Sequence, residues 1–153
     1  MNKIIFIFLF FIGCSPLALP NGNQDELEIV KFFLEESFKI ISKTEIDLKL
    51  KKILRKNHRI DIEKMAELGE QYNSTDYDVF EIPTKRMILL GQSKNFYFIV
   101  YDKGGRVPVR ILSTGSLIKK RADFVDLILH DGTLNSIEEI KEDINNKKYT
   151  NNW

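Results

Sequence analysis

The chain has 153 residues and carries 23 Lys and Arg against 22 Asp and Glu, a formal net charge of +1. This balance argues against a nucleic-acid-binding protein, which carries a clear excess of basic residues. Eleven Phe and five Tyr argue against a disordered tail, and the length suits one domain with a single hydrophobic core.

The N-terminal segment has the layout of a secretory signal peptide. Lys3 supplies a positive charge, Ile4–Ile12 is apolar throughout, and the small residue Gly13 stands before Cys14. We therefore expect residues 1–13 to be a signal peptide that is removed during export.

The order Phe11-Ile12-Gly13-Cys14 resembles the lipobox of bacterial lipoproteins. Gly13 and Cys14 match that pattern directly, whereas Phe11 stands where Leu is usual. The resemblance implies that the Cys14 thiol is diacylated, with chains such as palmitate, and that the new amino terminus is acylated too. Since Cys14 is the single cysteine, its acylation would leave no thiol for a disulfide, for thiol catalysis or for a metal site.

Two other interpretations of this segment stay open. One is an ordinary signal peptide cut near Ala18, although Ala18-Leu19-Pro20 is not an A-x-A pattern. The other is an uncleaved membrane helix, but Ile4–Ile12 would span only about 14 Å of a hydrocarbon core about 30 Å thick. We therefore expect the lipid on Cys14 to be the whole membrane attachment, on the periplasmic or surface side of a bacterial cell envelope.

Helices are expected after a short tether over residues 14–23. Apolar residues recur with helical spacing over about Gln24–Ser42, and a second helix is expected over Thr44–Lys56. The stretch Asp47–Lys51 also alternates, which leaves a strand there as an alternative. A third, short helix is expected after the cap residue Asp61. The apolar residues that define the first helix are Leu27, Val30, Leu34 and Ile41.

Strands and a last helix are expected in the second half of the chain. Five segments have strand-like composition: Val79–Ile82, Arg86–Leu90, Asn95–Tyr101, Val107–Leu112 and Phe124–Leu129. Gly104-Gly105 predicts a hairpin turn, and Ser136 with Glu139 predicts a capping box before a C-terminal helix. The fold class is therefore α+β: N-terminal helices, an antiparallel sheet of four or five strands, and a C-terminal helix in one domain over residues 24–148. We expect the helices on one face of a curved sheet, and a frayed tail over residues 149–153.

The run of aromatic residues at 96–101 indicates how the two faces of its strand are covered. Alternation along a strand places Tyr97, Ile99 and Tyr101 on one face of the sheet. Aromatic residues on both faces predict either a central strand covered on each side or a strand with one face left for a partner. The residues on the opposite face are Phe96, Phe98 and Val100.

No catalytic frame is recognisable around the two histidines. His130 and Asp131 could be combined with a serine, but no G-x-S-x-G frame positions a nucleophile. We interpret His130 as a strand-end residue and His58 as a solvent-exposed loop residue. No spacing typical of a zinc or calcium site occurs either, so we expect no metal, no cofactor and no enzymatic activity.

Charge is segregated in the middle of the chain. Residues 49–59 hold six basic side chains and no acid, whereas residues 61–81 hold seven acids and only Lys64 as a base. One interpretation is a solvated helix face that its acidic neighbour partly balances. The other is a bipolar surface that orients a protein partner, because complementary charge gives specificity and a fast encounter. The residues predicted to contact such a partner are Lys49, Lys52, Arg55, Lys56 and Arg59.

These observations predict a non-enzymatic lipoprotein that binds another protein of the cell envelope. An immunity lipoprotein, which neutralises an effector near the membrane, is one concrete version of this function. The alternative is a small-ligand-binding lipoprotein with a pocket between the curved sheet and the helices. The expected partners are the membrane, through the lipid on Cys14, and an envelope protein, but no nucleic acid.

Overall fold

The computed structural model describes residues 22–75, 77, 79, 81–118 and 124–151. The predicted signal peptide, the tether as far as residue 21 and the lipidation residue Cys14 lie outside the described residues. Within the described part of the chain, no helix is long and apolar enough to cross a membrane.

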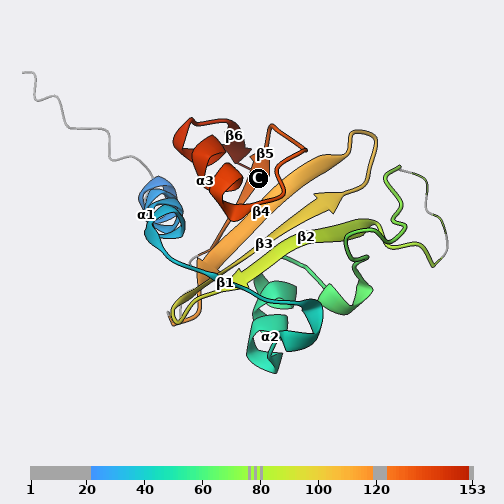
Figure 1. Ribbon diagram of the computed structural model, residues 1–153, viewed down its shortest axis with the longest axis horizontal. Coiled ribbons are helices and arrows are strands. Elements are labelled where there is room, and N and C mark those ends of the chain that lie inside the picture. The colour runs from blue at the N-terminus through green and yellow to red at the C-terminus, as the bar shows by residue number, and fades with distance from the viewer. Residues whose placement is uncertain (1–21, 76, 78, 80, 119–123, 152–153) are drawn as a thin grey trace, which may run out of the picture.

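The centre of the fold is a six-stranded antiparallel sheet in which each strand pairs with the next one in the sequence (Figure 1). The strands are β1 (Lys39–Ile40), β2 (Lys85–Gln92), β3 (Phe96–Lys103), β4 (Val109–Ser116), β5 (Phe124–Leu129) and β6 (Tyr149–Asn151). The predicted α+β class is confirmed, but the sheet has six strands where four or five were expected. The short edge strands β1 and β6 lie in segments that were predicted to be a helix end and a frayed tail.

Three α-helices accompany the sheet: α1 (Gly22–Glu35), α2 (Leu48–Asn57) and α3 (Ile137–Asn145). Two single turns of 3-10 helix, η1 (Lys43–Glu45) and η2 (Ile62–Lys64), flank α2. Since the third predicted helix is only the turn η2, the helical part of the chain is shorter than its apolar spacing indicated.

Two of the predicted boundaries are wrong for reasons of pairing. The first helix ends at Glu35 because Lys39 and Ile40 pair with Gln92 and Gly91 of β2. The described residues of the predicted strand Val79–Ile82 form a turn instead, in which the amide of Ile82 donates to the carbonyl of Val79. Glu81 has a positive φ of 68° there, which is incompatible with an extended strand.

The helices cover both faces of the sheet, which corrects the expectation that they share one face. α1 and α3 lie on one face, and α2 lies on the other (Figure 1). The α1/α3 side buries Ile29, Phe33, Phe98, Val100, Leu112, Leu127, Ile140 and Ile144. The α2 side buries Leu50, Leu54, Ile60, Tyr97, Ile99 and Ile111.

Strand β3 runs through the middle of this three-layer arrangement. Tyr97, Ile99 and Tyr101 face α2, whereas Phe98 and Val100 face α1 and α3. The predicted alternation is confirmed, as is the alternative in which the strand is covered on both sides.

Two local sequence signals are also confirmed, the capping box before α3 and the glycine turn after β3. The Ser136 hydroxyl accepts the amide of Glu139 at 3.2 Å, and the Glu139 carboxylate accepts the amide of Ser136 at 3.2 Å. This reciprocal pair begins α3 as the capping box predicted. Gly104 and Gly105 lie in the turn between β3 and β4, where a Cβ at Gly104 would overlap the carbonyl of Asn73.

Candidate functional site

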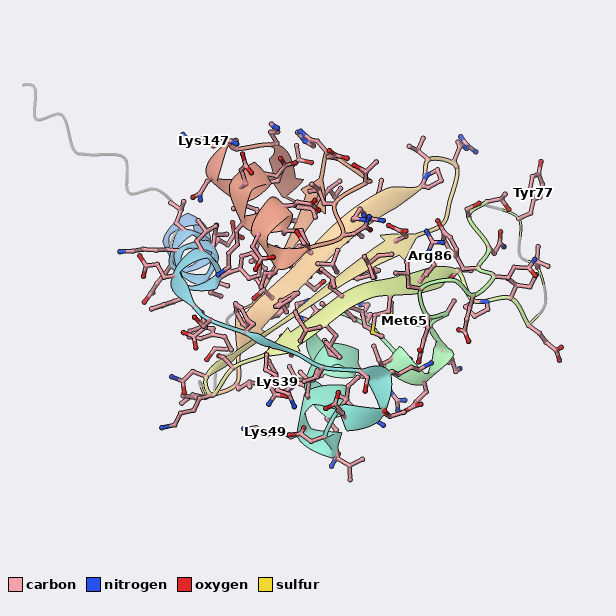
Figure 2. The ribbon with its side chains drawn as sticks, in the orientation of Figure 1. Lys39, Lys49, Met65, Tyr77, Arg86 and Lys147 are labelled. Carbon is pink, nitrogen blue, oxygen red and sulfur yellow. The ribbon has the colours of Figure 1, made fainter. Side chains whose placement is uncertain are left out.

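Helix α2 presents its basic residues to solvent because its apolar residues hold the opposite side against the sheet. Leu50 and Leu54 are fully buried, and Asp47 caps the first turn by accepting the amide of Leu50 at 2.7 Å. The lysines on the remaining side are exposed, and Figure 2 shows Lys49 on the outer side of α2.

The structure divides the five basic residues that were predicted to contact a partner. Lys49, Lys52 and Lys56 stand at positions i, i+3 and i+7 of α2, so they form one exposed stripe, which we call the lysine stripe. These three lysines make no ion pair with any residue that the structure describes. Arg55 and Arg59 lie apart from this stripe.

Part of the basic charge is neutralised by the acidic segment that follows. Arg55 pairs with Asp61 at 2.9 Å, and Lys51 pairs with Glu63 at 2.6 Å. Arg59 lies beyond the helix end with a φ of 54°, and its carbonyl accepts Lys85 Nζ. The interpretation of a helix face balanced by its acidic neighbour is therefore confirmed for one side of α2 but not for the lysine stripe.

His58, which was predicted to be exposed, is instead buried at the end of α2. Its side chain has 0% exposure; Nδ1 lies 2.6 Å from Asp126 Oδ1 and Nε2 lies 2.7 Å from the Tyr97 hydroxyl. Its ring also meets the ring of Phe124 edge to face, with centroids 4.8 Å apart. The prediction was wrong because a histidine in a polar stretch reads as a loop residue, whereas here it connects α2 to β3 and β5.

The Asp126–His58–Tyr97 chain has the order of a catalytic triad but not its accessibility. Burial raises the pKa of Tyr97, so its hydroxyl stays protonated and shares a hydrogen bond with Nε2, while Nδ1 shares the other with the Asp126 carboxylate. Tyr97 has 0% exposure, so no substrate reaches its hydroxyl. We interpret this chain, the His58 cluster, as a structural bond between the sheet and α2.

His130 lies at the exposed end of β5, as predicted. Its neighbour Asp131 turns away into the next loop, where Oδ1 accepts the amide of Thr133 at 2.8 Å and the Thr133 hydroxyl at 2.6 Å. These hydrogen bonds lower the pKa of Asp131. The pair therefore gives no catalytic arrangement of the Ser-His-Asp kind.

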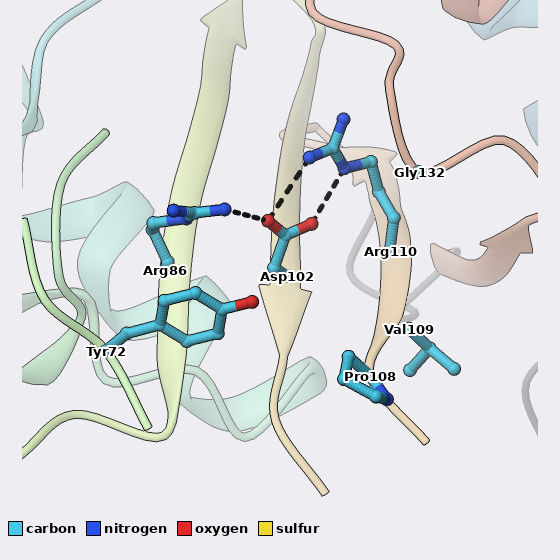
Figure 3. A pocket seen from close by; sticks show the side chains of 7 residues that line it. All are labelled: Tyr72, Arg86, Asp102, Pro108, Val109, Arg110 and Gly132. Atoms are coloured by element: carbon cyan, nitrogen blue, oxygen red, sulfur yellow. Dashed lines mark hydrogen bonds and ion pairs between the residues drawn. The ribbon is translucent and has the colours of Figure 1, made fainter. Parts of the chain in front are cut away.

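A second charged cluster, which the sequence did not predict, crosses three neighbouring strands. Arg86 of β2 pairs in register with Asp102 of β3, and Asp102 pairs with Arg110 of β4. Asp102 accepts Nε and Nη2 of Arg110 at 2.7 Å and 3.2 Å, and Nη2 of Arg86 at 2.8 Å. We call these three residues the arginine cluster (Figure 3).

The arginine cluster forms the floor of a cavity of about 240 Å³ at the end of the sheet. Its walls come from Tyr72 before β2, Pro108 and Val109 in β4 and the preceding turn, and Gly132 after β5. The guanidinium of Arg86 lies over the Tyr72 ring, 4.4 Å from its centroid. The cavity lies on the same face of the sheet as α1 and α3, because Asp102 alternates in step with Val100.

Electrostatics keep the arginine cluster charged. Burial raises the pKa of Asp102, but the hydrogen bonds and charges of Arg110 and Arg86 lower it further, so the net pKa lies below the ordinary value. Asp102 is therefore an anion at neutral pH, and the two guanidinium groups leave the cluster with one net positive charge.

Among the described residues, no group of three or more His, Cys, Asp or Glu side chains is placed to hold a metal ion. Comparison with known proteins finds no family model that matches the chain, and no curated protein or solved structure that is significantly similar to it. The two sites that the geometry defines, the lysine stripe and the cavity above the arginine cluster, therefore carry the functional argument.

Proposed function

We propose that this protein is a lipid-anchored cell-envelope protein whose domain binds an acidic surface of another envelope protein through the lysine stripe. The lipobox-like segment ending at Cys14 supports the anchor. The observation that carries the binding site is that Lys49, Lys52 and Lys56 share one exposed face of α2 without an ion pair to any described residue.

Lys56 lies in the last turn of α2, where a positive charge complements the helix dipole, but Lys49 and Lys52 have no such role. Like charges three and four residues apart on a helix destabilise it by about 0.2–0.5 kcal/mol per pair. The same charges favour encounter with an acidic partner, because complementary potentials raise the association rate and set the orientation of docking. Lys51 and Arg55 lack this property because Glu63 and Asp61 already neutralise them.

The position of α2 suits a partner that approaches from the side away from the anchor. The described chain begins at α1, on the opposite face of the sheet from α2 (Figure 1). A domain tethered through its N-terminus would keep the lysine stripe on its free side. An immunity lipoprotein that intercepts an effector near the membrane would use such an arrangement.

Charge reversal of the stripe tests this function. The acylated, tagged protein with K49E/K52E/K56E is compared with the wild type for partner recovery from gently solubilised envelopes. The matched control is K94E/K103E/K147E, which changes the net charge equally at exposed positions outside α2. Figure 2 shows Lys147 beside α3, on the far side of the sheet.

We expect the amount of partner recovered at low salt to fall by at least about tenfold in the stripe variant and to stay unchanged in the control variant. The reason is that complementary charges attract strongly only where they approach closely across the interface. A Cys14→Ala protein, expressed alongside, separates loss of the anchor from loss of the surface. Equal recovery by both triple variants would disprove the role of the lysine stripe.

Binding of a small ligand is the second candidate function, and the cavity above the arginine cluster is the observation that favours it. The cavity is not the expected pocket between the curved sheet and the helices, because none of its lining residues belongs to a helix. The cavity lies on the face that α1 and α3 cover, but at the end of the sheet, between the loop of Tyr72 and the loop of Gly132.

A further inference from the structure

We propose that the cavity above the arginine cluster binds a small carboxylate that carries a short apolar group. This site is separate from the lysine stripe, because it lies on the other face of the sheet. The two proposals therefore succeed or fail independently.

The sign of the ligand charge follows from the cluster. Arg86 and Arg110 contribute two positive charges against the single negative charge of Asp102. The Arg110 side chain is only 5% exposed and that of Asp102 is 11% exposed, so water screens these charges poorly. An anion in the cavity is attracted, whereas an amine is repelled by Arg86 and finds both oxygens of Asp102 already bonded to arginine.

The free hydrogen-bond donors identify the atoms that would hold the ligand. Arg110 is occupied, since Nε and Nη2 bind Asp102 while Nη1 donates to the carbonyl of Leu134 and to Asn135 Oδ1. Arg86 makes one hydrogen bond within the described part of the chain, from Nη2 to Asp102, and its side chain is 27% exposed. Arg86 Nε is buried without a partner, so the donors of Arg86 that are open to a ligand are those of Nη1 and the second hydrogen of Nη2.

Tyr72 provides a second donor next to Arg86. Its hydroxyl makes no hydrogen bond with any residue that the structure describes, and Figure 3 shows it pointing toward β3 and the carboxylate of Asp102. The loop that carries Tyr72 is held firmly, because the amide of Asn73 donates to the carbonyl of Pro83 at 2.7 Å and Gly105 donates to the carbonyl of Ser74. The phenol is thus held in position beside Arg86.

The size and lining of the cavity define the rest of the ligand. About 240 Å³ lies just under the roughly 300–1,000 Å³ of common ligand pockets, so the occupant is small. The Tyr72 ring and Pro108 offer apolar surface for a short hydrocarbon or aromatic group, whereas the Val109 side chain packs on the α2 side of the sheet. The two oxygens of a planar carboxylate match one guanidinium and one hydroxyl, and inorganic phosphate is the alternative anion that the experiment must separate from it.

Benzoate is the probe, with benzamide as the neutral molecule of the same shape and inorganic phosphate as the alternative anion. Each is titrated into the full-length, ¹⁵N-labelled protein in a neutral detergent, and amide shifts are followed at Val109, Arg110 and Gly132. We expect saturable shifts at these residues with benzoate only. Failure of benzoate to shift them, an equal response to benzamide, or tighter binding of phosphate would each overturn the proposal.

Three variants assign the effect to the proposed atoms. R86Q is expected to weaken benzoate binding by roughly tenfold or more, and Y72F by roughly two- to tenfold. The matched control K103Q removes an exposed charge at the end of β3 and should leave the affinity unchanged. Because R86Q removes a partner of Asp102 and could impair folding, Y72F is the decisive variant: unchanged benzoate affinity in Y72F would refute the role of Tyr72, and with it the site as proposed.

Discussion

The two polar clusters of this domain differ in how completely their hydrogen bonds are made. In the His58 cluster, both ring nitrogens have a partner, Asp126 on one side and Tyr97 on the other, and the side chain is fully buried. In the arginine cluster, Arg110 is occupied but Arg86 retains donors, and a cavity opens beside it.

This difference separates a structural role from a binding role. Closed polar networks in a protein interior stabilise one arrangement of the surrounding elements, provided that every member is satisfied. The His58 cluster meets that condition and joins α2 to the sheet. The arginine cluster has a net charge and unused donors at a surface opening, which are the features that a ligand can complete.

Removal of Asp102 should have the largest effect on stability. D102A leaves Arg110 buried without its counter-charge, so we expect the free energy of unfolding to fall by about 3–5 kcal/mol. Urea unfolding followed by circular dichroism measures this loss. E142A, at an exposed position of α3, is the control and should stay within about 0.5 kcal/mol of the wild type. A loss below about 1 kcal/mol in D102A would show that the cluster is solvated rather than buried.

The same chemical change in each cluster provides a sharper comparison. Y97F leaves His58 Nε2 buried without a partner and should cost about 1–3 kcal/mol in unfolding free energy. Y72F removes a hydroxyl that has no partner among the described residues and should cost less than about 0.5 kcal/mol. Benzoate binding should show the reverse order, with Y72F impaired and Y97F unaffected. Equal destabilisation by the two variants would remove the distinction between the clusters.

The smallest effect expected is a dependence of stability on acid pH. The pKa of Asp102 is lower in the folded protein than in the unfolded chain, so its contribution to stability is present above the unfolded pKa of about 4 and is lost as the pH falls through the folded pKa. Unfolding free energies from pH 6 down to pH 2 should therefore fall less steeply in D102N than in the wild type. Parallel curves would contradict the ionised state of Asp102.

The sequence predicted those parts of the fold that depend on near neighbours. The alternation around Tyr97 and the Ser136–Glu139 capping box need only a few consecutive residues, and both are confirmed. The end of the first helix could not be predicted in this way. Phe38 fits a helical spacing, but the pairing of Lys39 and Ile40 with a strand about fifty residues later decides the local structure.

The residues of the two sites also differ in whether near neighbours or distant pairing determine them. The charge run at residues 49–59 was enough to predict exposed basic residues, but not that Lys49, Lys52 and Lys56 alone share one face without an ion pair to a described residue. The arginine cluster depends instead on the register of three strands, and β2 has a bulge between Met87 and Leu89 that shifts this register. One signal was available, because Asp102 falls on the same face as Phe98 and Val100 and therefore required a counter-charge within the core layer.

The position of α1 has a consequence for the order in which the domain can assemble. Ile29 and Phe33 belong to the first described helix, yet they pack with Leu127 of β5 and with Ile140 and Ile144 of α3, which are synthesised last. In the β2–β3–β4 meander each strand pairs with the next one in the sequence, so its pairing does not depend on the last part of the chain. The apolar side of α1 therefore gains its full cover only once β5 and α3 are in place, so we expect α1 to dock late in folding.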